Sequence, residues 1–133
     1  MNTMKTYKVV VDVYSTICWY NEKGQFHCEH GPAVEYVDGD KFWYQNNKYH
    51  RLDGPAFEYA NGDKRWYQNG KLHRLDGPAV EYSDGNKRWF IEGVKYTQAE
   101  FKKKVKELKN PKSPCDGKIV TIEGKQYKLQ ELK

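Results

Sequence analysis

The hydrophobic and polar positions of this chain recur with a period of 23 residues. From His50 the chain reads His-Arg-Leu-Asp-Gly-Pro-Ala-Phe-Glu-Tyr, and the same order returns from His73 with Val in place of Phe. A third copy begins at His27, and Trp19-Tyr20 ends a half copy upstream, one residue out of step. A fixed period of this length is typical of repeat architectures, in which each unit buries its apolar face against its neighbours.

Turn-forming dipeptides divide each repeat into two strands. The first turn of the repeats is Asp38-Gly39, Asn61-Gly62 or Asp84-Gly85, and the second is Asn46-Asn47, Asn69-Gly70 or Glu92-Gly93. Such pairs favour two-residue hairpin turns, because Gly, Asn and Asp tolerate positive φ best. We therefore expect an antiparallel meander. Tyr7–Tyr14 and Ile17–Tyr20 predict two more strands upstream, and the recurring Gly-Pro pair predicts a bend that curls the sheet into a trough.

Two-residue turns would also fix which residues face each other across the strands. Counting back from each turn gives the predicted pairs: Phe57 with Trp66, Glu58 with Arg65, Trp66 with His73, Tyr67 with Leu72, and Arg65 with Arg74. One face of the sheet would then hold the apolar core, formed by Phe57, Tyr59, Trp66 and His73 with Val34, Tyr36, Trp43, His50, Val80, Tyr82 and Trp89 as counterparts. The other face would be charged and aromatic, with Glu58, Arg65, Tyr67, Arg74, Glu35, Tyr44, Arg51, Glu81, Arg88 and Phe90.

The pattern changes after Tyr96. Thr97-Gln98-Ala99-Glu100 is a capping box, and Phe101, Val105 and Leu108 follow at helical spacing with lysines between them. Two strands at 118–122 and 125–129, joined by Glu123-Gly124, would form a last hairpin. The expected fold is mainly β: a half repeat to about 26, repeats at 27–49, 50–72 and 73–96, and an α+β cap of helix and hairpin at 97–133.

The motif Trp66-Tyr67-Gln68-Asn69-Gly70-Lys71-Leu72-His73, followed by Gly77, Tyr82 and Asp84-Gly85, resembles the MORN repeat. The resemblance covers about residues 15–96. It departs where MORN repeats have Gly after the His, since Arg51 and Arg74 stand there. The Asp-Gly-Pro-Ala variant looks like repeats in proteins of large bacteriophages and giant viruses. This resemblance implies an elongated β-hairpin scaffold that binds other proteins, or phospholipid in some members, without catalysis of its own.

Composition limits the class of protein. The 133 residues form one domain or a repeat array with an appendage, and aromatic residues make up 15% of them. No apolar run is long enough for a membrane span, and no leading segment resembles a signal peptide. Three cysteines, Cys18, Cys28 and Cys115, form no spaced framework, so we interpret them as thiols of a cytoplasmic protein.

The net charge of +5 belongs to the C-terminal segment. Residues 1–96 carry 13 basic and 13 acidic residues, whereas residues 97–133 carry 10 and 5. The repeats are therefore neutral, and their charge alone does not indicate nucleic-acid binding. The lysine-rich helix face is interpreted as a solvated face, with contact to nucleic acid or an acidic membrane as its alternative.

The predicted binding residues lie on the charged and aromatic face: Tyr44, Arg51, Arg65, Tyr67, Arg74, Arg88 and Phe90. Guanidinium groups beside exposed rings are used at protein interfaces and also to hold bases or nucleotides. The alternative is cross-strand ion pairing of Glu58 with Arg65 and of Glu81 with Arg88. Because Arg74 would face Arg65 instead of an acid, this spot is the strongest candidate for binding an anion or an acidic partner.

The histidines and cysteines give weaker signals. His50 and His73 are interpreted as packed, hydrogen-bonded imidazoles that recur because the unit recurs. His27, Cys28 and His30 could start a zinc site, but a fourth ligand at matching spacing is missing, and a drifted terminal repeat is the preferred explanation. We expect no metal and no cofactor.

These observations lead to an expected function. The chain would be a non-enzymatic repeat scaffold that acts through protein–protein interaction, such as a phage-encoded inhibitor of a host or defence protein in the host cytoplasm. The alternative is a binder of an anionic ligand, which could be a nucleotide, a nucleic acid or a phospholipid head group. A membrane is not the expected partner, and the edge strand at Val9–Val13 offers a route to a homo-oligomer.

Overall fold

The computed structural model describes residues 5–110, 119–122 and 125–128. In these ranges the protein is mainly β, with most strands in one antiparallel meander that does not close, and with a single helix. This architecture confirms the predicted fold class. The chain divides into two compact units, residues up to 98 and residues from 99 on, which are described separately.

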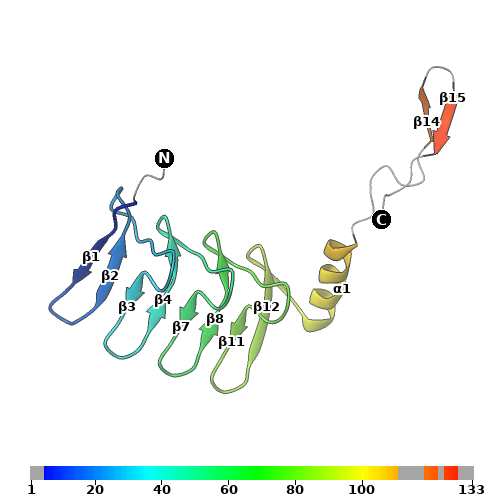
Figure 1. Ribbon diagram of the computed structural model, residues 1–133. Coiled ribbons are helices and arrows are strands. Elements are labelled where there is room, and N and C mark those ends of the chain that lie inside the picture. Colours follow the sequence, from blue (N-terminus) through cyan, green and yellow to red (C-terminus); the bar gives the residue numbers. More distant parts are fainter. Residues whose placement is uncertain (1–4, 111–118, 123–124, 129–133) are drawn as a thin grey trace. The chain divides into compact units, whose positions relative to one another are not determined.

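The strands of the first unit fall into one large sheet and two short hairpins. The sheet contains, in spatial order, β1 (Lys8–Val11), β2 (Ile17–Tyr20), β3 (Val34–Glu35), β4 (Lys41–Phe42), β7 (Phe57–Glu58), β8 (Lys64–Arg65), β11 (Val80–Glu81), β12 (Lys87–Ile91) and β13 (Val94–Tyr96). The hairpins are β5 (Tyr44–Gln45) with β6 (Lys48–Tyr49), and β9 (Tyr67–Gln68) with β10 (Lys71–Leu72). Figure 1 shows the labelled strands of this unit standing side by side from β1 to β12.

The second turn of each repeat is the predicted two-residue turn. Asn69 and Gly70 have φ of 51° and 79°, and Tyr67 pairs with Leu72, as the sequence predicts. The Asn46-Asn47 and Glu92-Gly93 turns have positive φ at both positions as well. Positive φ at both central residues gives the turn the twist that suits a hairpin.

The first turn of each repeat has three residues instead of two, so its predicted pairing is wrong by one position. Tyr59 donates its N–H to the carbonyl of Asp63, and only Gly62 of the three residues between them has positive φ, at 98°. Asn61 accepts the N–H of Asp63, which stabilises this wider turn. Phe57 therefore pairs with Arg65, and Glu58 pairs with Lys64. A three-residue loop that ends in glycine is the next most common hairpin after the two-residue turn.

This one-residue shift exchanges the two faces of every second strand, because side chains alternate along a strand. The aromatic face, as we name it, carries Val34, Tyr36, Phe42, Tyr44, Tyr49, Phe57, Tyr59, Arg65, Tyr67, Val80, Arg88 and Phe90. The tryptophan face carries Trp43, Trp66, Trp89, His50, His73, Arg51, Arg74, Glu58 and Glu81. The predicted grouping of Trp66 with Phe57, and of Arg74 with Arg65, is therefore wrong.

The chain crosses between the large sheet and the short hairpins at the tryptophans. Trp43 lies between β4 and β5, and its backbone N–H donates to the carbonyl of Ala56. The backbone N–H of Trp66 donates to the carbonyl of Ala79 in the same way. Ala56 and Ala79 are completely buried, as is Ala33. Only a small side chain fits this crossing, which explains why Ala follows each Gly-Pro. The Gly-Pro pairs themselves lie in the loops that lead from β6 to β7 and from β10 to β11.

The second unit contains α1 (Gln98–Lys109), β14 (Ile119–Ile122) and β15 (Lys125–Lys128). The helix begins directly after Thr97, where the capping box predicts it, and Phe101 is its buried residue. Ile122 pairs with Lys125 across the predicted hairpin, whereas Leu129 lies outside the described residues.

Candidate functional site

The predicted binding residues do not share one face. Arg51 and Arg74 lie on the tryptophan face, whereas Tyr44, Arg65, Tyr67, Arg88 and Phe90 lie on the aromatic face. The three-residue turn causes this separation, since it reverses one strand of each predicted pair.

Tyr44 and Tyr67 belong to a packed cluster of rings. Phe57 is 4.4 Å from Tyr49 and 4.9 Å from Tyr67 between ring centroids, and Tyr44 is 4.5 Å from Tyr49. Phe42 and Tyr59 extend the cluster along the sheet. Burial raises the pKa of the Tyr44 and Tyr59 hydroxyls above the ordinary range. Tyr44 and Tyr67, both half-buried, therefore serve mainly in packing, because aromatic pairs at these distances stabilise the sheet.

Arg51 and Arg74 are held by identical sets of contacts. Arg74 donates to Asp76 at 2.7 Å, to the carbonyl of Pro78 at 3.0 Å and to Glu81 at 3.1 Å. Its guanidinium lies 3.9 Å from the ring centroid of Trp66. In the repeat before, Arg51 contacts Asp53, Pro55, Glu58 and Trp43 in the same way.

These contacts correct two expectations. Arg74 pairs with Asp76 and Glu81 and does not face Arg65, and Glu58 and Glu81 pair with Arg51 and Arg74 instead of Arg65 and Arg88. Planar guanidinium groups suit this combination of stacking and forked hydrogen bonding. Each arginine therefore fixes its own Arg-Leu-Asp-Gly-Pro loop. The hydrogen bond from Arg51 also holds the pKa of Asp53 below its usual range.

The fixed loops present leucines to solvent. The side chain of Leu52 is 75% exposed, and Leu75, at the same position of the next repeat, is 40% exposed. In the first repeat Cys28 stands in place of the arginine, and Glu29 in place of the leucine. Glu29 instead pairs with Lys5 at 2.7 Å, which lowers the pKa of the carboxyl.

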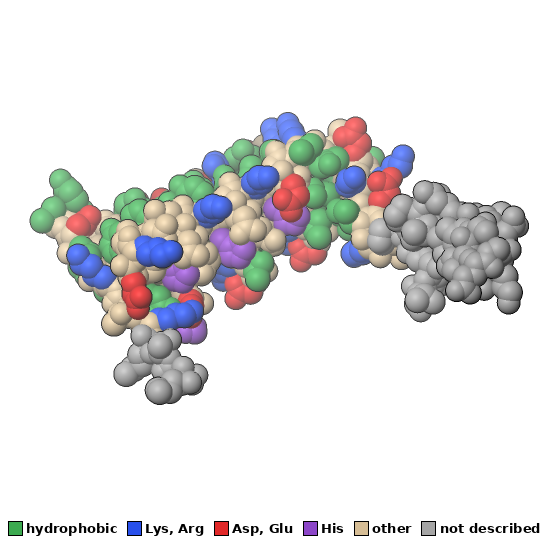
Figure 2. Space-filling view, turned by 90° about the horizontal axis from the view of Figure 1, so that it is seen from above, with side chains coloured by type: hydrophobic (Ala, Val, Ile, Leu, Met, Phe, Trp, Pro, Cys, Tyr) green, Lys and Arg blue, Asp and Glu red, His purple; other side chains and the backbone are tan. Residues whose placement is uncertain are grey.

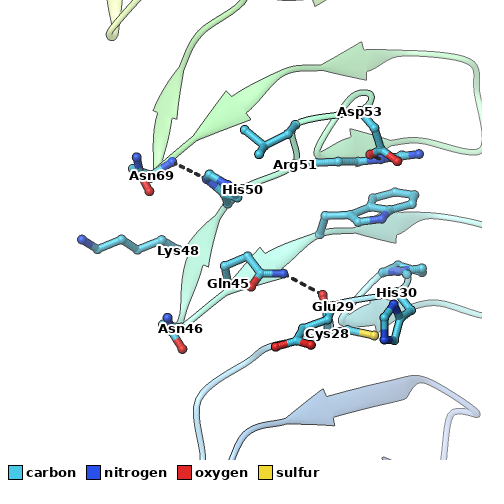
Figure 3. A pocket seen from close by; sticks show the side chains of 14 residues that line it. Cys28, Glu29, His30, Gln45, Asn46, Lys48, His50, Arg51, Asp53 and Asn69 are labelled. Atoms are coloured by element: carbon cyan, nitrogen blue, oxygen red, sulfur yellow. Dashed lines mark hydrogen bonds and ion pairs between the residues drawn. The ribbon is translucent and has the colours of Figure 1, made fainter.

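Two open grooves lie beside these loops, one repeat apart. The first has a volume of about 990 Å³ and lies between the loop at Cys28–Pro32 and the loop at His50–Asp53, with Trp43 and Gln45 also in its lining. The second, of about 650 Å³, has Trp66 and Gln68 at the same positions and lies between the loops at 51–55 and 73–76. Figure 3 shows Arg51, Asp53 and His50 on one side of the first groove and Cys28, Glu29 and His30 on the other.

The histidines tie the start of each repeat to its second turn. Nδ1 of His50 accepts the N–H of Asn69, and Nδ1 of His73 accepts the N–H of Glu92, each at 3.0 Å. Nδ1 of His27 accepts the N–H of Asn46 at 3.1 Å. Each bond runs to the first residue of the second turn of the same repeat. The prediction that His50 and His73 are hydrogen-bonded imidazoles is confirmed.

The metal candidates are not gathered into a ligand set. Nδ1 of His27 is used by Asn46, Cys28 is half-buried and His30 is exposed. Among the described residues, no group of three or more His, Cys, Asp or Glu side chains is placed to hold a metal ion. Cys115 lies outside these residues.

Arg65 and Arg88 are left without acids at ion-pair distance among the described residues. They flank Val80 at the same level of three adjacent strands, since Val80 pairs with both. The Arg65 guanidinium lies 5.4 Å from the Tyr59 ring centroid, and its buried Nε has no hydrogen-bond partner in the described part of the chain.

The sequence pattern alone did not reveal two further sets of residues. Asp40 and Asp63 accept the N–H groups of Ala60 and Ser83 in the next repeat, each at 2.7 Å, and this bond lowers the pKa of Asp63. Opposite charges also alternate across six strands, in the order Glu35, Lys41, Glu58, Lys64, Glu81 and Lys87. These residues recur every 23 positions, which could have indicated their role. Showing which of them face each other required the strand register that the three-residue first turn sets.

Charged side chains of both signs gather along the repeats. Figure 2 shows basic side chains at intervals along one side of the β unit, with histidine and acidic side chains close to them. No helix in the described ranges is long and apolar enough to cross a membrane. A comparison of the chain with family models, curated proteins and solved structures finds no match.

Proposed function

We propose that this chain is a non-enzymatic, MORN-like repeat scaffold that binds an extended segment of another protein along its tryptophan face. The observation that carries the proposal is the repeated Arg-Leu-Asp-Gly-Pro loop, which the arginine holds in place while the leucine points into solvent. A surface that is already ordered loses little conformational entropy on binding. Isolated exposed leucines are common, but leucines on two matching rigid loops beside grooves suit a partner.

The spacing of the grooves supports an extended partner. Each repeat adds two strands about 4.8 Å apart, so equivalent grooves recur about every 10 Å. A segment in the polyproline II conformation advances about 3.1 Å per residue with three residues per turn, so side chains three residues apart lie on the same side and would enter successive grooves. The partner segment we expect therefore carries apolar side chains at positions i and i+3.

The chemistry of the repeat supports a binding role over catalysis. The recurring histidines use Nδ1 to hold backbone N–H groups, and the recurring arginines on the tryptophan face are bonded to Asp, Glu and carbonyl groups. The proposed partner is a host or defence protein in the cytoplasm, with this chain as a phage-encoded inhibitor. The resemblance of the Asp-Gly-Pro-Ala repeat to viral repeats supports this part of the proposal.

Affinity capture with surface variants tests the proposed face. Leu52→Asp and Leu75→Asp place charges on exposed loop positions, so they should leave the fold intact and remove the captured partner. Val37→Asp is a matched control, because Val37 is 78% exposed in a turn at the other end of the strands. If the leucine variants retained the partner that the wild type captures, or if the Val37 variant lost it, the tryptophan face would be the wrong surface.

A second candidate function is the binding of an anionic ligand on the aromatic face. It is favoured by Arg65 and Arg88, which have no ion pair among the described residues, and by the buried Nε of Arg65. Titration with a nucleotide, with single-stranded nucleic acid and with vesicles that contain acidic lipid separates the possible ligands. Binding that depends on Arg65 should weaken steeply with salt and should be lost in Arg65→Gln but not in Arg51→Gln.

A further inference from the structure

We propose that β1 is a self-association edge, at which a second copy of this chain adds its own β1 in antiparallel orientation. The two nine-stranded sheets then become one continuous sheet through a two-fold axis. β1 lies at one end of the sheet, and no described strand pairs with its outer side. This inference does not depend on the proposed partner or on the tryptophan face.

The backbone of β1 has its free hydrogen-bonding groups at two valines. Asp12 donates its N–H to Thr16, next to β2, and Trp19 of β2 donates away from β1 to Ala33. Backbone groups alternate in direction along a strand, so Lys8 and Val10 bond to β2. The N–H and carbonyl groups of Val9 and Val11 therefore point outward, where a further strand would bond.

The side chains of this edge lack the usual protection against pairing. Val9, Val11 and Val13 are 46%, 62% and 90% exposed, and Tyr14 beside them is also exposed. The four residues of β1 include no proline, and all four pair regularly with β2 without a bulge. Edge strands of monomeric proteins are commonly blocked by prolines, bulges or several charges, because an open edge invites another strand.

The charges of the strand favour a second copy as the occupant. An antiparallel pair centred on Val10 places Val9 opposite Val11, which matches their outward backbone groups. The same register places Lys8 opposite Asp12 of the other copy, on the same side of the sheet, and it does so twice by symmetry. Neither side chain makes an ion pair among the described residues. Opposite charges that face each other across a strand pair are stabilising.

The other edge of the sheet does not have this self-complementarity. β13 reads Val94-Lys95-Tyr96, so an antiparallel pair centred on Lys95 would place two lysines against each other. Like charges directly opposite are destabilising. The two edges therefore differ, and Lys95 provides a control position on a strand of similar exposure.

The oligomeric state of the full chain tests the proposal. Sedimentation velocity over a dilution series should show a reversible dimer. Lys8→Glu places an acid opposite Asp12 in each half of the interface and should raise the dimer dissociation constant by roughly tenfold to a hundredfold. Lys95→Glu should leave the constant unchanged. Val11→Pro removes an outward N–H without breaking a bond to β2, so it should abolish the dimer while circular dichroism shows a folded chain.

Amide exchange locates the contact by residue. The amides of Val9 and Val11 should become protected as the protein concentration rises, whereas those of Lys8 and Val10 should be protected at every concentration. A wild-type chain that stays monomeric throughout the dilution series would overturn the proposal. So would a dimer that survives Val11→Pro and Lys8→Glu, or one that dissociates on Lys95→Glu, because each result would place the contact elsewhere.

Discussion

At the scale of single residues, the side chains that recur in every repeat mostly bond within the array. His73 is buried beside the second turn of its own repeat, and its Nδ1 accepts the N–H of Glu92. Asp63 accepts the N–H of Ser83 in the same direction along the array. Repetition of these residues is therefore explained by hydrogen bonds within and between repeats, and it does not by itself indicate a reactive site.

Removing the acceptor of His73 should destabilise the array. His73→Phe keeps a ring of similar size but leaves the Glu92 N–H without its partner, so we expect a loss of about 1–3 kcal/mol in the free energy of unfolding. His30→Phe is the control, since His30 is exposed, and its effect should stay within about 0.5 kcal/mol. Urea denaturation measures both. Equal effects of the two variants would contradict the assigned bond.

The pKa of Asp63 predicts a contribution to stability that depends on pH. The bond from Ser83 lowers this pKa in the folded state below the ordinary value of 3.8. The folded state therefore binds fewer protons than the unfolded state in this range, so the contribution is present above about pH 4 and is lost as pH falls through the folded pKa. Asp63→Asn keeps a side-chain acceptor but cannot ionise.

We expect the difference in unfolding free energy between wild type and Asp63→Asn to be constant above about pH 5 and to shrink below about pH 4. Thermal unfolding at several pH values measures it. A difference that stayed the same at acid pH would show that the charge of Asp63 has no part in the joint.

At the scale of elements, the Arg-Leu-Asp-Gly-Pro loop depends on a glycine against which the arginine packs. A Cβ at Gly77 would lie 3.0 Å from Cζ of Arg74, and one at Gly54 would lie 2.9 Å from Cζ of Arg51. At Gly31, in the same position of the first repeat, nothing lies within 4 Å, because Cys28 replaces the arginine. Gly31 therefore serves as an internal control for Gly54 and Gly77.

Alanine at these glycines should lower the free energy of unfolding in the two repeats that have the arginine, but not in the repeat that lacks it. Gly54→Ala and Gly77→Ala push the guanidinium away from its acceptors, and we expect each to cost about 1–3 kcal/mol. Gly31→Ala should change the free energy of unfolding by less than about 0.5 kcal/mol. Chemical denaturation of the three single variants provides the test, and a loss at Gly31 as large as at Gly77 would be inconsistent with arginine packing.

At the scale of the whole β unit, the alternating acids and lysines bind the strands into one charge ladder. Lys64 faces Glu58 on one side and Glu81 on the other, whereas Lys87 faces Glu81 alone. Each cross-strand pair of this kind contributes a fraction of a kcal/mol. The ladder therefore stabilises the sheet through many small and nearly equal contributions, one from each cross-strand pair.

Reversing one charge should lower the free energy of unfolding in proportion to the number of opposite charges that face it on adjacent strands. Lys64→Glu creates two like-charge contacts and should destabilise the unit by about 1–2 kcal/mol, roughly twice the effect of Lys87→Glu. The difference should decrease at high salt, because both lysines are exposed. Urea denaturation at low and high salt measures it, and equal losses for both variants would contradict the ladder.

The sequence by itself determined the repeat period, the antiparallel meander, the two-residue second turn and the start of the helix after Thr97. These features depend on local chemistry, such as the tolerance of Asn69 and Gly70 for positive φ. The pairing of Tyr67 with Leu72 followed from that turn.

Only the tertiary structure decided which side chains share a face. Asp-Gly and Asn-Gly fit both a two-residue and a three-residue turn, and a shift of one residue reverses a whole strand. That shift placed Arg65 beside Phe57 and left Arg74 stacked on Trp66. The partners of Arg74 come from three positions in the folded loop and strand, so their meeting depended on a register that the sequence pattern did not specify.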